Sequence, residues 1–167
     1  MESPRYIEPE APCYPDLRGR VAIVTGAGTN IGRGIALRLA REGARLLICG
    51  RRESLLEETC GLAHQAGAEC AVLRADLTSE QDIDRLFNTV MDAYGTLDVL
   101  IQNAADMRMT YSQEATLAEW DHSFATIARG AFLLASQAYK LMEPRRDGVL
   151  IFVSTVGALR AHRPGGR

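Results

Sequence analysis

The chain has 167 residues, of which 47% are hydrophobic and 24% are charged, and its formal net charge is −2. This length and composition are typical of a single globular domain with a core of its own. The nearly neutral charge gives no reason to expect nucleic acid or an anionic membrane as a partner, and no apolar run approaches the length of a membrane span.

The first part of the chain, residues 1–18, is rich in proline and has no apolar periodicity. We therefore expect a flexible extension there, ahead of a domain over residues 19–167. The extension lacks the apolar core of a signal peptide, which predicts a cytoplasmic protein. The four cysteines form no C-x-x-C pair and have no histidine at metal-ligand spacing, so neither a disulfide framework nor a zinc site is expected.

From Arg20 onward, short apolar runs alternate with segments of helical period. Continuous apolarity over a few residues is typical of strands buried on both faces of a parallel sheet. The runs are Val21–Thr25, Arg45–Cys49, Glu69–Leu73, Val99–Gln102 and Val149–Val153. Strands that alternate with helices predict an α/β fold, a doubly wound parallel sheet with right-handed crossovers.

Two of the helical segments carry clear signals. The first has apolar residues at i, i+3 and i+4 from Ile83 to Tyr94, and Thr78 or Ser79 can cap its start. The second is longer and should end at Pro144. Its apolar residues at the same spacing, which predict one core-facing stripe, are Trp120, Phe124, Ile127, Ala131 and Leu134.

A glycine-rich turn and the start of a helix follow the first apolar run. Amides at a helix N-terminus point outward with a partial positive charge, and glycines let the backbone approach a phosphate closely, so this arrangement favours a pyrophosphate. No glycine is followed by the lysine and hydroxyl of a triphosphate site, and Ile31 stands where G-x-G-x-x-G requires glycine. The longer pattern Thr25, Gly26, Asn30 and Gly32 fits instead and resembles the short-chain dehydrogenase/reductase family.

The resemblance implies a Rossmann-type fold and a cofactor pyrophosphate held by the glycine-rich turn. The residues of the turn that it assigns to the cofactor are Gly26, Gly28, Thr29, Asn30, Ile31 and Gly32. The family has a glycine where this chain has Asn30, a residue that tolerates positive φ, so we expect the turn to keep its shape. The asparagine side chain can crowd a phosphate or hydrogen-bond to it, and both readings stay open.

The end of the second predicted strand bears on the choice between nicotinamide cofactors. Members of the family that prefer NAD place an acidic residue there to hold the ribose 2′-hydroxyl. This chain has Gly50-Arg51-Arg52 instead. A guanidinium pairs with a 2′-phosphate, which an acid would repel, so NADP(H) is expected in preference to NAD(H), with Arg51 as the contact. The alternative is that both arginines are solvated residues at a helix start.

Two further segments match the family. The one after the third strand resembles the acidic segment that contacts the adenine ring, although a plain helix cap by Asp76 or Thr78 is an alternative. The one after the fourth strand resembles the family's Asn-Asn-Ala-Gly, in which Asn103 would tie the strand end to its neighbours and small residues leave room for the cofactor. The residues assigned to cofactor binding in these segments are Asp76, Leu77, Asn103, Ala104 and Ala105.

The family's catalytic residues match this chain less completely. A tyrosine with a lysine four residues later exchanges the proton in this family, and a serine polarises the substrate carbonyl. The serine position falls on Thr155, with Ser154 beside it, although both hydroxyls can simply cap the strand end. The asparagine of the proton relay falls on Ile127, which is expected in the core. None of the tyrosines has a lysine four residues on, so the pair is expected beyond Arg167.

These observations predict a fold truncated after the fifth strand, with that strand as an exposed apolar edge. One reading is the cofactor-binding part of an NADP(H)-dependent oxidoreductase that acts on a small carbonyl or secondary alcohol and forms a homo-oligomer only at full length. The other reading is a non-catalytic NAD(P)-binding or sensor protein, or an inactive truncated product. A metal-dependent enzyme has little support because the histidines are scattered along the chain.

Overall fold

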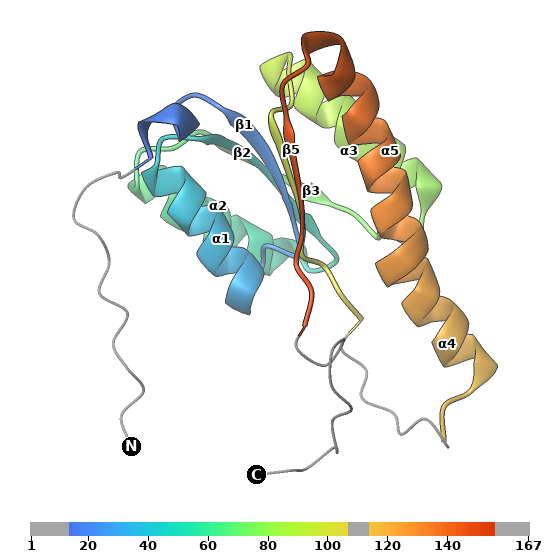
Figure 1. The fold of residues 1–167 in the computed structure, drawn as a ribbon. Coiled ribbons are helices and arrows are strands. Elements are labelled where there is room, and N and C mark those ends of the chain that lie inside the picture. The colour runs from blue at the N-terminus through green and yellow to red at the C-terminus, as the bar shows by residue number, and fades with distance from the viewer. Residues whose placement is uncertain (1–13, 107–113, 156–167) are drawn as a thin grey trace.

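A computed structural model describes residues 14–106 and 114–155 of the chain (Figure 1). Its centre is a parallel sheet in the order β3-β2-β1-β4-β5. The strands are β1 (Val21–Thr25), β2 (Arg45–Gly50), β3 (Cys70–Arg74), β4 (Val99–Gln102) and β5 (Val149–Phe152). The doubly wound, Rossmann-type α/β fold predicted from the sequence is confirmed. Each predicted strand lies within one residue of the observed one at either end.

Helices cover both faces of this sheet. They are α1 (Asn30–Arg41), α2 (Glu53–Gln65), α3 (Glu80–Tyr94), α4 (Leu117–Phe124) and α5 (Gly130–Met142). Figure 1 shows α1 and α2 on one face, and α3 with α5 on the other. Ser79 caps α3, because its hydroxyl accepts a hydrogen bond from the amide of Asp82, and Gly95 ends the helix at φ 71°. One of the two caps predicted from the sequence, Ser79, is therefore confirmed.

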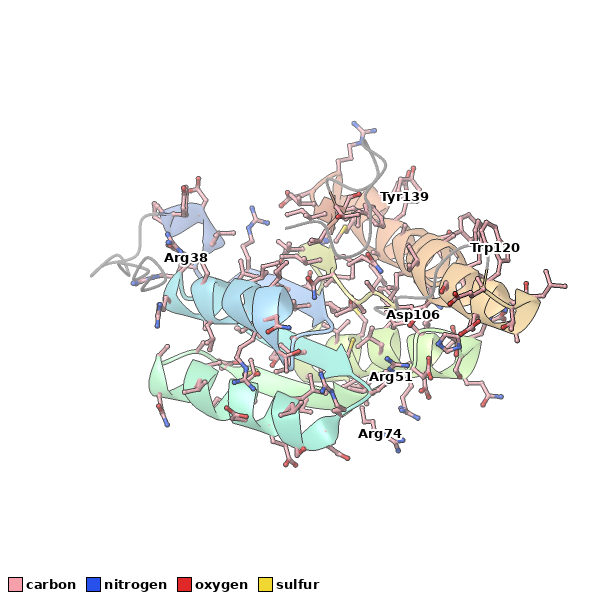
Figure 2. The ribbon with its side chains drawn as sticks, turned by 90° about the horizontal axis from the view of Figure 1, so that it is seen from below. Arg38, Arg51, Arg74, Asp106, Trp120 and Tyr139 are labelled. Carbon is pink, nitrogen blue, oxygen red and sulfur yellow. The ribbon has the colours of Figure 1, made fainter. Side chains whose placement is uncertain are left out.

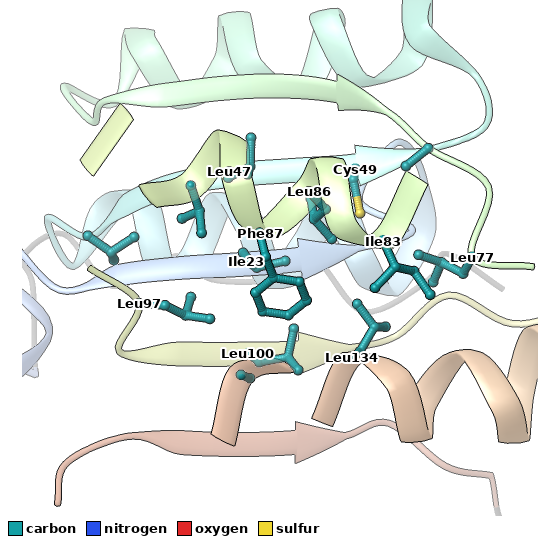
Figure 3. Packing of buried hydrophobic residues seen from close by; sticks show 14 of the residues in the cluster. Ile23, Leu47, Cys49, Leu77, Ile83, Leu86, Phe87, Leu97, Leu100 and Leu134 are labelled. Atoms are coloured by element: carbon teal, nitrogen blue, oxygen red, sulfur yellow. The ribbon is translucent and has the colours of Figure 1, made fainter. Parts of the chain in front are cut away.

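The core consists of two apolar layers, one on each face of the sheet. On the face of α3 and α5, Ile23 and Leu100 from the sheet pack with Phe87 and Leu134 from the helices (Figure 3). On the face of α1 and α2, alternate strand residues such as Ile48 pack against the helices. Because both faces are covered, the central strands are apolar throughout, as the sequence predicted.

The segment between α4 and α5 differs from its prediction. A π-helical stretch, η2 (Ala125–Arg129), joins the two helices, so residues before and after it do not share one stripe at α-helical spacing. The core position predicted for Ile127 is wrong, because this side chain is 46% exposed. Trp120 is 60% exposed, and its ring stacks on that of Phe124. The buried residues of α5 are Gly130, Leu134, Ala138 and Met142.

The described chain begins earlier than the predicted domain. Residues 14–18, expected within the flexible extension, include a short 3₁₀ turn (Pro15–Leu17). The amide of Tyr14 donates to the carboxylate of Glu42 at 2.8 Å, and the Arg38 guanidinium lies 5.5 Å from the Tyr14 ring centroid. Residues 1–13 lie outside the described part. No helix within residues 14–106 and 114–155 is long and apolar enough to cross a membrane.

Candidate functional site

A cavity of about 660 Å³ opens where the strands end at their carboxyl termini. It lies beside β1, whose neighbours β2 and β4 lead to opposite halves of the sheet, and ligands of open α/β sheets bind at this reversal of strand order. All of the residues that the sequence proposed for a site line this cavity: Gly26, Gly28, Thr29, Asn30, Ile31, Gly32, Arg51, Asp76, Leu77, Asn103, Ala104, Ala105, Ser154 and Thr155.

The glycine-rich turn is packed so closely that two of its positions have no room for a side chain. A Cβ on Gly32 would stand 2.3 Å from the carbonyl oxygen of Gly26 and 2.5 Å from the Asn103 side-chain nitrogen. Gly26 itself has φ 67°, and a Cβ there would stand 2.9 Å from the Cα of Ala104. The turn therefore needs glycine both for its backbone shape and for the contact between turn and strand end.

The first residues of helix α1 line the cavity. Asn30, its first residue, has φ 49°, so the left-handed conformation expected at this position is confirmed. Thr29 precedes it with extended backbone and makes no capping hydrogen bond with its side chain. The first amides of α1 consequently have no intrahelical partner and add the positive end of the helix dipole to this side of the cavity.

Asn103 ties the ends of β1 and β4 together, as the sequence predicted. Its amide donates to the hydroxyl of Thr25 at 3.0 Å, and its side-chain nitrogen donates to the carbonyl oxygen of Thr25 at 3.0 Å. The amide of Ala104 donates to the same hydroxyl at 3.0 Å. These bonds fix the floor of the cavity under the glycine-rich turn.

Arginines gather at the other end of the cavity, beyond β2 and β3. Arg51 and Arg52 follow β2 and line the cavity, and Arg74 ends β3 (Figure 2). Nε of Arg74 donates to the carbonyl oxygen of Arg51 at 3.4 Å, and a side-chain nitrogen of Arg52 donates to the Thr29 hydroxyl at 3.3 Å. Neither Arg51 nor Arg74 forms a salt bridge with a carboxylate among the described residues.

Asp76 faces the cavity between these arginines and α4. Its carboxylate accepts hydrogen bonds from the amide and the hydroxyl of Thr78, both at 2.9 Å. Burial disfavours the charged form, but the hydrogen bonds from Thr78, with the nearby charges of Arg51 and His122, hold the pKa of Asp76 below its ordinary value. The alternative that Asp76 or Thr78 caps α3 is wrong, because the cap is Ser79.

Ser154 and Thr155 come shortly after β5, beyond Val153, and both are exposed and line the cavity. Thr126, which belongs to the π-helical stretch before α5, also lines the cavity. Its hydroxyl donates to the carbonyl oxygen of His122 at 3.0 Å. Ile127, the position assigned by resemblance to a relay asparagine, is not among the lining residues. Ser154 and Thr155 therefore lie after β5, on the opposite side of β1 from the arginines that follow β2 and β3.

Residues 20–165 match the protein family described as short chain dehydrogenase. The chain belongs to the short-chain dehydrogenase family. A hydroxynaphthalene reductase-like protein of Metarhizium anisopliae is 34% identical over 143 residues, which cover 85% of this chain and 53% of the relative. The tetrahydroxynaphthalene reductase of Pyricularia oryzae is 33% identical over 137 residues, which cover 81% of this chain and 48% of that protein.

A solved structure has the same fold as this chain and is about as similar to it in sequence as these relatives are. It is a variant of actinorhodin polyketide ketoreductase crystallised with NADPH, with a TM-score of 0.82 and 32% identity over 86% of this chain and 56% of that chain. The chain spans about half the length of the curated relatives that it matches.

Some residues that line the cavity were not assigned to a site from the sequence: Cys49, Gly50, Arg52, Leu56, Ala75, Thr126 and Val153. Most of them adjoin a residue that was named, so extending each motif by one position would have found them. Thr126 had no such signal, because α-helical spacing does not predict the π-helical stretch in which it lies. Cys49 is fully buried, and burial raises its pKa to about 12, so its thiol stays neutral at physiological pH.

Among the residues that the structure describes, no tyrosine lines the cavity. The hydroxyl of Tyr94 donates to the carbonyl oxygen of Leu46 at 2.8 Å, and burial is the largest cause that raises its pKa to about 12. Tyr139 is exposed on α5. No cluster of metal-ligating side chains occurs within residues 14–106 and 114–155 either.

Proposed function

We propose that this chain binds NADP(H) in the cavity at the carboxyl ends of its strands and forms the cofactor-binding part of an oxidoreductase. The proposed reaction transfers hydride between NADP(H) and a small carbonyl compound or secondary alcohol. The observation that carries the proposal is that one cavity is lined by the glycine-rich turn, the arginines after β2, Asp76, Asn103 and the hydroxyls after β5. The NADPH in the related ketoreductase structure supports the same cofactor class.

The residues present fit a dinucleotide. The turn between Gly26 and Gly32 has no space for a Cβ at either end, which leaves bare backbone where a pyrophosphate would approach. The amides that begin α1 would donate to the phosphate oxygens, and Arg51 would pair with a 2′-phosphate. Asp76, whose pKa is held below its ordinary value and which is therefore a carboxylate at neutral pH as aspartates usually are, would accept a hydrogen bond from the adenine amino group.

The far end of the cavity would hold the substrate. When bound, the cofactor supplies a hydride to a carbonyl carbon or accepts one from a secondary alcohol. The hydroxyl of Ser154 or Thr155 would donate a hydrogen bond to the carbonyl oxygen and so favour the charge that develops on it. The described residues offer no tyrosine for the accompanying proton, so in this proposal the proton donor comes from outside them.

A second candidate function is NAD(P) binding without catalysis. It is favoured by the exposed Ile127 at the position of the family's relay asparagine and by the absence of a lining tyrosine in the described part of the chain. Oxidation of added NADPH in the presence of carbonyl compounds separates the two candidates. Binding without turnover over a panel of ketones would favour the second.

Titration of the purified chain with NADPH and with NADH, followed by protein fluorescence and melting temperature, tests the proposal. A ligand that binds only the folded state raises the melting temperature, and we expect a larger rise with NADPH. If neither nucleotide changes either signal, the cavity is not a dinucleotide site and both candidate functions are wrong.

Arg51→Asp tests the basis of the preference. The carboxylate would repel a 2′-phosphate and accept hydrogen bonds from a ribose 2′-hydroxyl, so the order of affinities should reverse in favour of NADH. Arg146→Asp, the same charge change in a turn outside the cavity, is the matched control and should keep the preference for NADPH. An unchanged preference in Arg51→Asp would exclude Arg51 as the 2′-phosphate contact.

A further inference from the structure

The back of the glycine-rich turn, the side away from the cavity, is held by side chains of α1 and α2. Arg33 of α1 is half-buried and reaches the carbonyl oxygen of Gly28 with two nitrogens, Nε at 3.1 Å and Nη2 at 2.8 Å. Its Nε also lies 3.0 Å from the hydroxyl oxygen of Thr59 on α2. The guanidinium therefore joins the turn to both helices.

Thr59 holds the preceding carbonyl of the turn. The residue is fully buried, and its hydroxyl oxygen lies 3.1 Å from the carbonyl oxygen of Ala27 and 2.9 Å from that of Leu55. The single hydroxyl hydrogen is donated to one of these carbonyls, while the oxygen accepts from Arg33. A buried hydroxyl with this set of partners favours one backbone conformation of the turn.

These two carbonyl contacts decide where the amides of the turn point. A trans peptide places its N–H opposite its C=O, and no peptide bond of the described chain is cis. With the carbonyls of Ala27 and Gly28 turned toward α1 and α2, the N–H groups of Gly28 and Thr29 point the other way. Gly28 and Thr29 line the cavity, and no described group accepts a hydrogen bond from either amide.

We propose that Arg33 and Thr59 are positioning residues that orient the amides of the glycine-rich turn for the pyrophosphate of the cofactor. The inference rests on the proposed function. Neither side chain lines the cavity, so both act through the backbone of the turn and not by touching the ligand. Glu58 pairs with Nη1 of Arg33 at 2.8 Å on the exposed side, and its carboxylate accepts no hydrogen bond from the turn among the described residues.

Two variants change this arrangement without removing bulk. Thr59→Val keeps the shape of the side chain and loses the hydroxyl, and Arg33→Lys keeps the charge and loses the planar donor fork. Glu58→Gln is the matched control, because it removes the exposed ion pair and leaves the bonds to the turn. Melting temperatures without ligand show that each variant folds.

The test compares two ligands on each variant by fluorescence titration. NADPH contains the pyrophosphate, whereas adenosine 2′-monophosphate contains only the adenosine and 2′-phosphate groups. We expect Thr59→Val and Arg33→Lys to weaken NADPH binding by about tenfold, the value of one hydrogen bond lost, with adenosine 2′-monophosphate affected less than about twofold. Glu58→Gln should leave both affinities unchanged.

Three outcomes would overturn the inference. Unchanged NADPH affinity in both variants would show that the turn keeps its amides in place without these bonds. Equal losses for the two ligands would show a general loss of structure in place of an effect on the pyrophosphate. If the unmodified chain binds neither ligand, the proposed function itself is wrong; the unmodified chain thus separates this failure from the other two.

Discussion

Strands β1 and β5 belong to the same parallel sheet and are similarly apolar in sequence, but they are buried to very different extents. Every residue of Val21–Thr25 is buried, whereas Val149, Ile151 and Phe152 of β5 are exposed. β1 pairs with β2 and β4 and has helices over both faces, while β5 pairs only with β4 in the described sheet. An apolar run thus indicates a strand, and its place in the strand order decides its burial.

The two ends of the cavity, one after β1 and one after β5, differ in a similar way. The turn after β1 is held on one side by Asn103 and on the other by Arg33, so this end of the cavity is fixed by hydrogen bonds among the described residues. The end after β5 carries two exposed hydroxyl residues, Ser154 and Thr155, on a partly exposed strand. We therefore expect changes near β1 to have much larger effects than equivalent changes in β5.

The largest expected effect comes from matched isoleucines in the two strands. Ile23→Ala should lower the free energy of unfolding by about 2–5 kcal/mol, because the side chain is fully buried and the substitution leaves a cavity. Ile151→Ala should cost less than about 1 kcal/mol, because Ile151 is 43% exposed. Urea denaturation of both variants measures the two values. Equal losses would contradict the contrast between the strands.

The second prediction concerns the turn itself. Gly32→Ala forces a Cβ against the carbonyl of Gly26 and should reduce NADPH affinity by at least about a hundredfold, about 2.7 kcal/mol. Gly34→Ala, two residues later in α1, meets no atom within 4 Å and should raise stability by about 0.5–1 kcal/mol without changing affinity. Calorimetric titration and thermal melting distinguish the two. Tight NADPH binding by Gly32→Ala would show that the turn is more adaptable than its packing indicates.

The third prediction concerns Asp98, which hydrogen-bonds to the first residue of β1 and to the first residue of β5. Its carboxylate accepts from the amide of Val21 at 2.8 Å and from Arg145 at 2.9 Å, and Arg20 lies 3.5 Å away. Burial opposes ionisation, but these hydrogen bonds and charges hold the pKa of Asp98 below its ordinary value. A carboxyl group with a depressed pKa stabilises the fold above its unfolded pKa, near 4, and this contribution is lost as the pH falls through the folded pKa.

Asp98→Asn should therefore lower the free energy of unfolding by about 2 kcal/mol at pH 7. The gap between the variant and the unmodified chain should narrow as the pH falls below about 4, where the unfolded state takes up the proton first. It should close once the pH is below the folded-state pKa, because the carboxyl group is then protonated in both states of the unmodified chain. Urea denaturation over a pH series measures this gap. A gap that stays constant down to pH 2 would show that the charge of Asp98 is not what stabilises the strands.

Much of the fold and of the cavity wall could be predicted from the sequence, because their signals are local. The apolar runs located the strands to within a residue, and the glycine pattern located the turn, including the left-handed conformation of Asn30. Parallel strands all end at the same edge, so motifs placed after successive strands come together in one cavity. The roles assigned to these residues stay predictions.

The features that the sequence did not reveal depend on contacts between distant residues or on irregular helix geometry. The exposure of Ile127 and the inward position of Thr126 follow from a π-helical stretch that α-helical spacing does not anticipate. The hydrogen bond of Arg33 with Thr59 joins two residues that lie 26 positions apart on different helices. The contact of the Tyr14 amide with Glu42 joins residues 28 positions apart, so the local sequence of residues 14–18 does not predict it.

The bond between Thr25 and Asn103 has a consequence for synthesis of the chain. The two residues lie 78 positions apart, and β1 receives its second neighbour only when β4 exists. On the ribosome, β1 can pair with β2 early, but its other edge stays unpaired until residues 99–103 have emerged. During that interval the second edge of β1, which is apolar, has no neighbouring strand. An unpaired edge of this kind makes unfinished chains prone to aggregate and is a reason for chaperones to bind them.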